Sequence, residues 1–392
     1  MSLNRRRFLF LAGVGAIGGL GLGAFARHSL TGTTANSSGR SPIAAPPTSA
    51  PQSVAIQKSA IAPKGLFAPM RGDVRIAVIS DLNSAYGSTD YQPQVDQAIS
   101  LIPDWQPDIV LGGGDMVAGQ SPSLSSQEIT AMWAGFDRHI SAPLRQAKLP
   151  FGFTIGNHDA SSALAVSGKF LFQNERDHAS AYWNDPSHDP GLQFVDRAKF
   201  PFYYTFQHKD IFYLVWDASS SLIPRDQVAW AEKSLASEVA QAAKMRIAIG
   251  HLPLYAVAVG RDEPGEVLAD ADKLRTMLER YNVHTYISGH HHAYFPGHSG
   301  KLELLHASAL GAGPRPLLNS NLPPFNTVTI IDVDLGAAST VYTTYDMKNL
   351  QVVDHKTLPR LIAGPTGKLL RLDVQESDLT ASERALTWQP SS

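Results

Sequence analysis

Five apolar runs of this chain, rich in the β-branched and aromatic residues typical of strands, end directly before a short segment of metal-ligand residues. In open α/β sheets, ligands bind where strands give way to loops. The pattern therefore predicts one site built from all five segments. The runs are residues 74–80, 109–113, 151–155, 245–249 and 283–288, followed by Asp81-Leu82-Asn83, Gly114-Asp115, Gly156-Asn157-His158-Asp159, Gly250-His251 and Gly289-His290-His291-His292.

The side chains of these segments point to metal ions. They offer carboxylate, amide and imidazole groups, and the chain has no cysteine. Such ligands suit Mn, Fe, Zn or Ni better than a soft metal. They are also too numerous for one tetrahedral ion, whereas two cations about 3.5–4 Å apart can bind phosphoryl oxygens and generate a hydroxide at neutral pH. Each residue alone reads as a turn, cap or structural residue, so only the ordered set predicts a two-metal site.

The order of the segments resembles the signature of the calcineurin-like metallophosphoesterase superfamily. That signature runs Asp-x-His, Gly-Asp, Gly-Asn-His-Asp/Glu, Gly-His and Gly-His-x-His. The resemblance covers roughly residues 71–350 and departs from the signature at Asn83. It implies an α/β fold, a four-layer sandwich of two mixed β-sheets flanked by helices. It also implies two divalent or di/trivalent metal ions as cofactors, such as Mn, Fe or Zn.

The resemblance gives each candidate a role. Asp115 would bridge the two metals, while Asp81, Asn83 and His292 would belong to the first metal and the other three ligands to the second. His158 would bind no metal and would protonate the leaving group as a general acid. The seven candidate metal ligands are Asp81, Asn83, Asp115, Asn157, His251, His290 and His292.

Two positions depart from the family pattern. Asn83 stands in place of a His ligand, so the first metal is expected to bind less tightly or to be a harder ion such as Mn. Ala118 stands where several branches carry an Asp that orients the catalytic His. Gly119 replaces an Arg of the protein serine/threonine phosphatases, and no Tyr follows Asp115 as in the purple acid phosphatases. The first of these differences argues against the protein serine/threonine phosphatase branch, and the second removes a ligand through which purple acid phosphatases bind iron. The arrangement around residues 289–294 and the hairpin at 203–206 is still most similar to the purple acid phosphatases and the class III cyclic-nucleotide phosphodiesterases.

The resemblance implies a metal-dependent phosphoesterase that cleaves phosphomono- or phosphodiesters by attack of a dimetal-bound hydroxide, with His158 as general acid. The alternative is a catalytically reduced module on the same fold that binds metal and a phosphorylated ligand, favoured only by Asn83 and Ala118. The expected substrate is a small phosphoester. The formal net charge of −2 shows no nucleic-acid footprint.

Further residues are candidates for the substrate rim. Arg315 lies in a Gly-Pro loop, where its guanidinium would match phosphate oxygens. Tyr255 and Tyr294 each follow a ligand motif by a few residues. Residues 160–199 follow His158 directly and have little regularity, so they form either a lid or an ordinary surface loop.

The remaining core reads as alternating helices and strands. Helical spacing covers residues 93–102, 127–144, 227–240 and 270–280; strand patterns cover a hairpin at 202–206 and 211–216, and late strands at 325–333 and 340–346.

The two ends of the chain lie outside this pattern. Residues 1–26 resemble a bacterial twin-arginine signal peptide, with Asn4-Arg5-Arg6-Arg7-Phe8-Leu9 before an uncharged apolar stretch. Residues 27–70 read as a Ser/Thr/Pro/Ala-rich linker, 71–350 as the metallophosphoesterase domain and 351–392 as a tail of little periodicity. The protein is expected to be periplasmic or secreted through the twin-arginine translocation machinery. The alternative is a membrane anchor formed by the uncleaved N-terminal segment.

Overall fold

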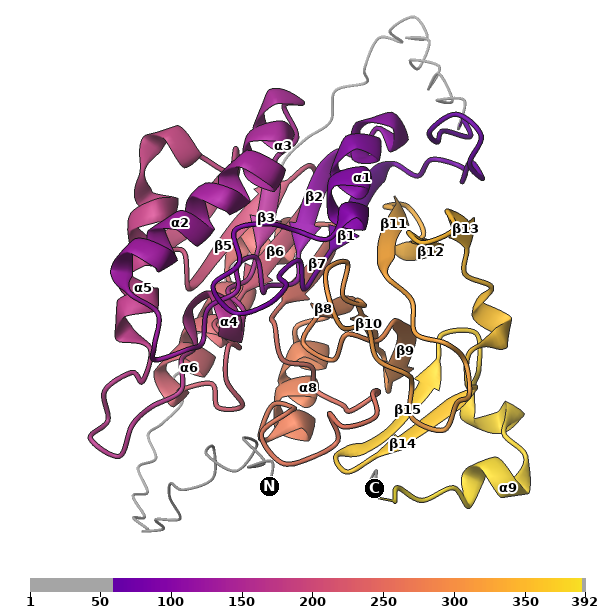
Figure 1. The fold of residues 1–392 in the computed structure, drawn as a ribbon. Coiled ribbons are helices and arrows are strands. Elements are labelled where there is room, and N and C mark those ends of the chain that lie inside the picture. Colours follow the sequence, from indigo (N-terminus) through magenta and orange to yellow (C-terminus); the bar gives the residue numbers. More distant parts are fainter. Residues whose placement is uncertain (1–58, 390–392) are drawn as a thin grey trace, which may run out of the picture. The chain divides into compact units, whose positions relative to one another are not determined.

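The computed structural model describes residues 59–389, and Figure 1 shows their strands arranged in two β-sheets. The predicted signal peptide, and residues 27–58 of the predicted linker, lie outside the described residues. The first sheet has the strand order β13-β12-β11-β1-β2-β3. Its strands are β1 (Val74–Ile79), β2 (Ile109–Gly112), β3 (Phe151–Phe153), β11 (Thr327–Asp334), β12 (Ser339–Asp346) and β13 (Gln351–Val352).

The second sheet has the order β14-β15-β9-β10-β8-β7-β6-β5-β4. Both sheets are mixed: β1, β2 and β3 run parallel, as do β6, β7, β8 and β10, while the outer strands pair antiparallel. The strands are β4 (Gln193–Lys199), β5 (Tyr203–His208), β6 (Ile211–Val215), β7 (Met245–Ile249), β8 (Thr285–Ser288), β9 (Phe295–Ser299), β10 (Leu302–His306), β14 (Leu361–Gly364) and β15 (Gly367–Arg371).

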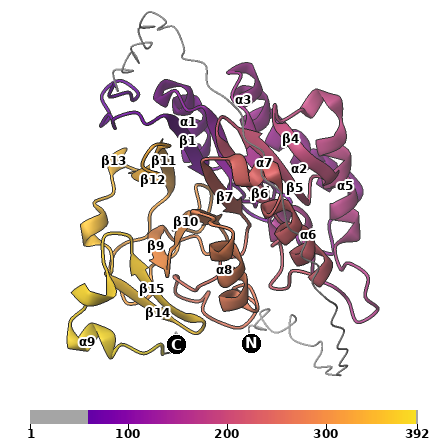
Figure 2. The same ribbon diagram turned by 180° about the vertical axis from the view of Figure 1, so that it is seen from behind.

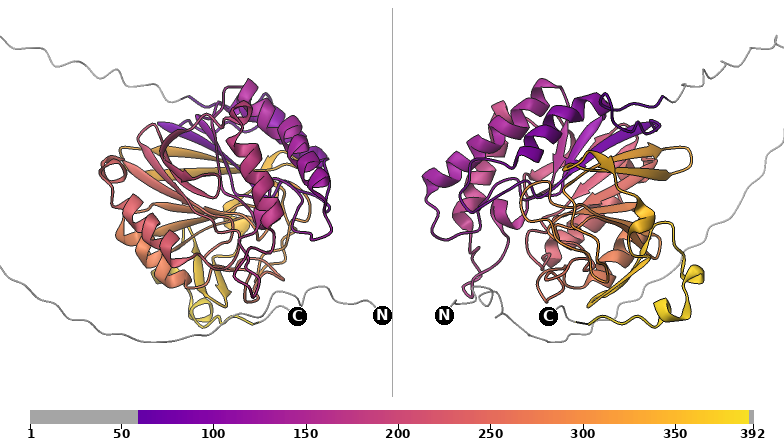
Figure 3. Two further views of the ribbon diagram at one scale, coloured as in Figure 1. Left: turned by 90° about the vertical axis from the view of Figure 1, so that its left-hand side faces the viewer. Right: turned by 45° about the vertical axis from the view of Figure 1, so that its right-hand side comes forward.

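Helices flank the sheets. Figures 2 and 3 show α1, α2, α3 and α5 along one side of the pair of sheets and α6, α7 and α8 along the other. None of the helices within residues 59–389 is long and apolar enough to cross a membrane. The helices are α1 (Pro93–Leu101), α2 (Ser126–Phe136), α3 (Ala142–Gln146), α4 (Asn157–Ala160), α5 (Gln173–Asn184), α6 (Arg225–Leu235), α7 (Glu238–Ala242), α8 (Ala271–Arg280) and α9 (Ala381–Arg384).

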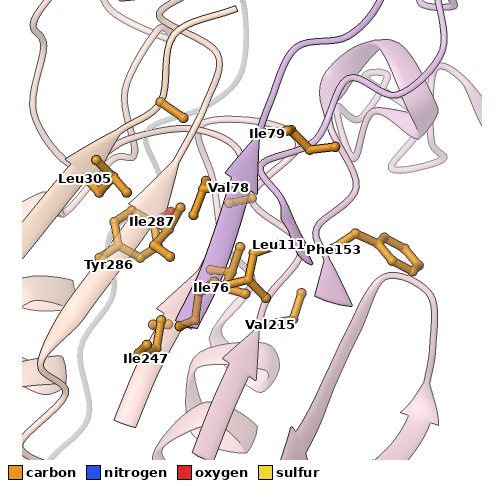
Figure 4. Close-up of a cluster of buried hydrophobic side chains, with 14 of the residues drawn as sticks. Ile76, Val78, Ile79, Leu111, Phe153, Val215, Ile247, Tyr286, Ile287 and Leu305 are labelled. Atoms are coloured by element: carbon orange, nitrogen blue, oxygen red, sulfur yellow. The ribbon is translucent and has the colours of Figure 1, made fainter. Parts of the chain in front are cut away.

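The core lies between the two sheets. Figure 4 shows Ile76 and Val78 of the first sheet beside Ile247 and Ile287 of the second. Every residue of β1 and β2 is buried, because each sheet is covered on both faces, which explains their uninterrupted apolar runs. The predicted sandwich of two mixed sheets flanked by helices is confirmed.

Three predictions of local structure need correction. The predicted helix at 227–240 is two helices that meet at Ala236 and Ser237. The stretch 160–199 is irregular only up to residue 172, since α5 and β4 fill most of the rest. The fold also extends beyond residue 350, because β13 joins the first sheet and β14 and β15 join the second.

The start of the fold lies earlier than the predicted boundary at residue 71. Ala60 pairs with Met70 in an isolated β-bridge. The buried Arg75 donates to the carbonyls of Ile61 and Pro69, both at 2.9 Å. Residues 59–70 of the predicted linker are thus held against the first sheet.

Candidate metal centre

The carboxyl ends of five parallel strands from both sheets meet at one place. Asp81 and Asp115 follow β1 and β2 of the first sheet, whereas His251 and His290 follow β7 and β8 of the second. Hydrogen bonds cross between the sheets here: His290 N–H donates to Asp81 Oδ1 (3.0 Å), and His251 Nδ1 lies 2.7 Å from the carbonyl of Gly113. The topology therefore assembles segments that are up to about two hundred residues apart in sequence.

The residues predicted for the second metal form the tighter cluster. His251 Nε2 lies 2.9 Å from Asn157 Oδ1 and 3.3 Å from Asp115 Oδ2. His290 Nδ1 lies 2.9 Å from the same Asn157 oxygen. All four side chains are buried.

The residues predicted for the first metal lie beside this cluster. Asp81, Asp115 and His251 have ligand atoms within 4.8 Å of one another. His292 Nε2 lies 3.2 Å from Asp81 Oδ1. Asn83 is buried next to them, and its backbone N–H donates to the carbonyl of Asp115 (3.2 Å). Within residues 59–389 its side-chain amide makes no hydrogen bond, so the Asn83 ligand assignment stays a prediction.

The backbone of the site is strained. Asp81, Asp115, His290 and His292 have φ values of 50°, 54°, 65° and 53°, in the left-handed region that residues with a Cβ rarely adopt. Such a conformation costs of order 1–2 kcal/mol per residue. Strain of this kind clusters at functional sites, where it aims side chains that the regular backbone could not.

The donor atoms fit a metal ion. Asn157 Nδ2 donates to Gln120 Oε1 (2.7 Å), which turns Oδ1 toward the two histidines. His251 Nδ1 must carry a proton, because its partner is the carbonyl of Gly113, and so a neutral ring has its lone pair on Nε2. His251 Nε2 and Asn157 Oδ1, both of which can bind a metal ion, thus lie 2.9 Å apart. Ligands about 2.0–2.2 Å from a shared metal lie ~3 Å apart, so the separation matches a common cation.

The charges favour a cation as well. Burial alone lowers the pKa of His251, but the carboxylates of Asp115 and Asp81 outweigh it and raise the pKa to about 9. Burial by itself raises the pKa of Asp115, but His251 and His158 hold it well below its ordinary value. Fixed negative charge that binds a proton this firmly also attracts a metal ion.

His158 stands beside the carboxylate predicted to bridge the metals. Its backbone N–H donates to Asp115 Oδ1 (2.8 Å), and its Nδ1 donates to the carbonyl of Gly119 (3.0 Å). Its Nε2 has no hydrogen-bond partner among the described residues. The Gly119 carbonyl thus replaces the orienting carboxylate that Ala118 lacks. The ring of Tyr86, which is 64% exposed, lies 5.3 Å from that of His158.

The three predicted substrate-rim residues have different environments in the structure. Tyr255 and Tyr294 are buried, and their hydroxyls contact Asp272 Oδ1 (2.9 Å) and His355 Nε2 (2.8 Å). Both tyrosines therefore belong to the core rather than to the rim. Arg315 is half-buried, and its backbone N–H donates to the carbonyl of His292 (2.8 Å), so it stays a candidate next to the site.

Several residues around the site were not found from the sequence. Gln120 orients Asn157, and its backbone N–H donates to the buried Glu175 (2.9 Å). Glu266 contacts His290. These residues come from loops and from α5, and they follow no motif. Only the position of Gln120, five residues after Asp115, could have drawn attention to it.

The chain is similar to known proteins in sequence pattern and fold. The family model described as calcineurin-like phosphoesterase matches residues 74–294. A similar structure is GAP50, the anchor in the inner membrane complex of Plasmodium, at 16% identity, covering 73% of this chain and 91% of that chain, with a TM-score of 0.43. Another is a putative 5'-nucleotidase from Staphylococcus aureus, at 13% identity, covering 80% and 57%, with a TM-score of 0.37. A third is Yfce, a phosphoesterase from E. coli, at 8% identity, covering 70% and 100%, with a TM-score of 0.26. No curated protein matches this chain in sequence.

Proposed function

Because the chain belongs to the calcineurin-like phosphoesterase family, we propose that it is a metal-dependent phosphoesterase acting on small phosphomonoesters or phosphodiesters. One observation carries the proposal: the candidate ligand atoms of Asn157 and His251, fixed by their outer contacts, lie 2.9 Å apart beside two buried carboxylates. When bound, two metal ions supply positive charge for the phosphoryl oxygens and a water-derived nucleophile of lowered pKa.

The chain's own residues would hold the two ions and protonate the leaving group. In this proposal Asp81, Asn83 and His292 would hold the first ion, Asn157, His251 and His290 would hold the second, and Asp115 would contribute to both. His158 protonates the leaving oxygen from Nε2, because Gly119 already accepts the Nδ1 proton.

The first test compares hydrolysis of a nitrophenyl monoester and a bis-nitrophenyl diester by metal-stripped protein given back Mn. Strong cleavage of either ester supports an enzyme and tells a monoesterase from a diesterase. His158→Ala should lose about 10²–10⁴-fold in turnover while its metal content stays unchanged. The loss should be larger for a phenyl ester than for a nitrophenyl ester, because the poorer leaving group depends more on the acid. His178→Ala, which changes a half-buried histidine of α5 that contacts Thr130, is the matched control.

The second candidate function is a binding module that holds metal and a phosphorylated ligand without turnover. Asn83 favours it, because a neutral amide is a weaker ligand than imidazole. Ala118 no longer does, since the Gly119 carbonyl orients His158. Wild-type protein that binds two metals and cleaves neither ester would establish this second function.

We further propose export by the twin-arginine route, from the Arg5-Arg6-Arg7 segment and the apolar stretch after it. Folded export would allow metal to be loaded before translocation. Replacing the three arginines by lysine should retain the protein in the cytoplasm. Sequencing the N-terminus of the exported protein distinguishes cleavage near residue 26 from an intact membrane anchor.

A further inference from the structure

A loop outside the five ligand motifs covers the histidines after β8. It spans residues 260–268, between β7 and α8. His291 fastens it: Nδ1 accepts from the backbone N–H of Val257 (3.2 Å), so Nε2 carries the proton and donates to the carbonyl of Glu266 (3.0 Å). His291 is fully buried. Both ring nitrogens of this histidine therefore bind backbone groups rather than a metal ion, and the bond to Glu266 fixes the backbone position of that residue.

The side chain of Glu266 returns to the neighbouring histidine. Its Oε2 lies 2.9 Å from His290 Nε2 and 2.6 Å from Arg261 Nη1. One carboxylate oxygen thus accepts from both a guanidinium and an imidazole. The Glu266 side chain is 29% exposed and that of His290 only 7%, so the contact lies where the site meets the surface loop.

This contact decides which nitrogen of His290 faces the site. Because Nε2 donates to a carboxylate, a neutral ring has its lone pair on Nδ1, the atom 2.9 Å from Asn157 Oδ1. His251 and His292 have the opposite arrangement, since their Nδ1 atoms contact backbone carbonyls and their Nε2 atoms face the site. Glu266 thus fixes which nitrogen of His290 carries the proton, as backbone carbonyls do for His251 and His292.

We propose that Glu266 is a positioning residue for the second metal, which fixes the tautomer and ring orientation of His290, and that Arg261 holds its carboxylate in place. The inference rests on the proposed function, because it requires a metal at His290. Outer carboxylate partners of ligating histidines typically contribute 10–100-fold to metal affinity. Glu266 lies outside the Gly-His-x-His motif, so the motif alone does not assign it.

The test titrates Mn into the metal-stripped full mature chain and measures the binding by calorimetry. Wild type is expected to bind two ions. Glu266→Ala should weaken one of the two steps by about 10–100-fold and leave the other unchanged. The affinity of Glu266→Gln in this step should lie between those of wild type and Glu266→Ala. Its amide oxygen still accepts from His290, but the ion pair with Arg261 is lost. Glu263→Ala, an exposed glutamate of the same loop, is the matched control.

Two further variants separate positioning from mere fastening of the loop. Arg261→Gln breaks the same ion pair but keeps the Glu266–His290 contact, so it should weaken the step by much less than Glu266→Ala. His290→Ala should weaken the same step, and the double variant Glu266→Ala/His290→Ala should be no weaker than His290→Ala alone.

The outcomes are distinct. Equal losses in Arg261→Gln and Glu266→Ala would mean that the loop is only fastened, and a Glu266→Ala variant that binds both ions as wild type does would also overturn the positioning role. In both cases the proposed function stands. Wild type that binds no Mn would instead overturn the proposed function, and this inference with it.

Discussion

At the scale of single residues, the chemistry of the site depends most on Asn83. The motif resemblance predicts that it stands in place of an imidazole ligand, and it is buried next to Asp115. An amide oxygen is neutral and binds borderline metals more weakly than imidazole does. The first metal position is therefore the weaker half of the proposed pair, and it is expected to be sensitive to metal concentration.

Asn83→His should tighten the first metal step by at least about tenfold for Zn, because imidazole nitrogen is the better ligand for this ion. Asn83→Ala should weaken it by a similar factor. Competition with a chelator of known affinity measures both. If Asn83→Ala binds the first ion as tightly as wild type, Asn83 is not a ligand.

That the candidate ligand residues lie together in the fold was predictable from the sequence, but the contacts that orient them were not. Asp81, Asp115 and His251 each follow a short, mostly apolar run that indicates a buried strand, and this local signal places them at the carboxyl ends of strands. The groups that orient the ligands, such as Gly119 and Gln120, act through backbone atoms or across loops. Nothing in the local sequence encodes these contacts.

At the scale of elements, α5 shows why part of the fold was missed. Its buried face includes Glu175, Arg176 and Ala179 together with two aromatic residues. Two charged residues on the buried side hide the helical spacing of apolar residues on which the prediction relied. The helix is buried through specific partners instead: Arg176 pairs with Asp217 at 2.8 Å, and its guanidinium lies 3.8 Å from the ring centroid of Phe202.

Asp217→Asn should destabilise the fold by about 3–5 kcal/mol, because it leaves the buried Arg176 charge without a counter-charge. The free energy of unfolding in urea measures this. Asp226→Asn, an exposed position in α6, is the control and should change stability little. A loss below about 1 kcal/mol for Asp217→Asn would show that backbone carbonyls alone satisfy the guanidinium.

Glu175 predicts a pH dependence for the same helix. Burial raises its pKa to about 7 from 4.5, against two backbone N–H donors that lower it. The folded state thus binds a proton that the unfolded state releases, so the associated stability is full below pH 4.5 and lost as pH rises through about 7. Glu175→Gln should therefore stabilise the protein by up to about 3 kcal/mol at pH 8 and by little at pH 4.5. Equal changes in stability at both pH values would contradict the raised pKa of Glu175.

At the scale of the whole molecule, the C-terminal strands complete two sheets whose first strands lie about 280 and about 170 residues earlier in the chain. β13 pairs with β12, and the hairpin of β14 and β15, yellow in Figure 1, covers the edge of β9. The hairpin was hard to predict because its strands are short and their apolar residues do not alternate strictly. Leu361, Leu370, Val374 and Leu379 form a small core of their own.

A chain ending at residue 350 should therefore melt lower and aggregate, although it keeps every proposed metal ligand. Each of the four apolar side chains contributes about 1.5–3 kcal/mol when fully buried, and their loss also exposes β9 as an unpaired edge. At ~2–4 °C per kcal/mol, thermal unfolding should begin more than about 10 °C lower. A chain ending at residue 386 keeps β13, β14 and β15 and should lose far less. If the chain that ends at residue 350 is as soluble as the full chain and has the same melting temperature, the hairpin does not contribute to stability. The phosphoesterase fold is then complete at residue 350.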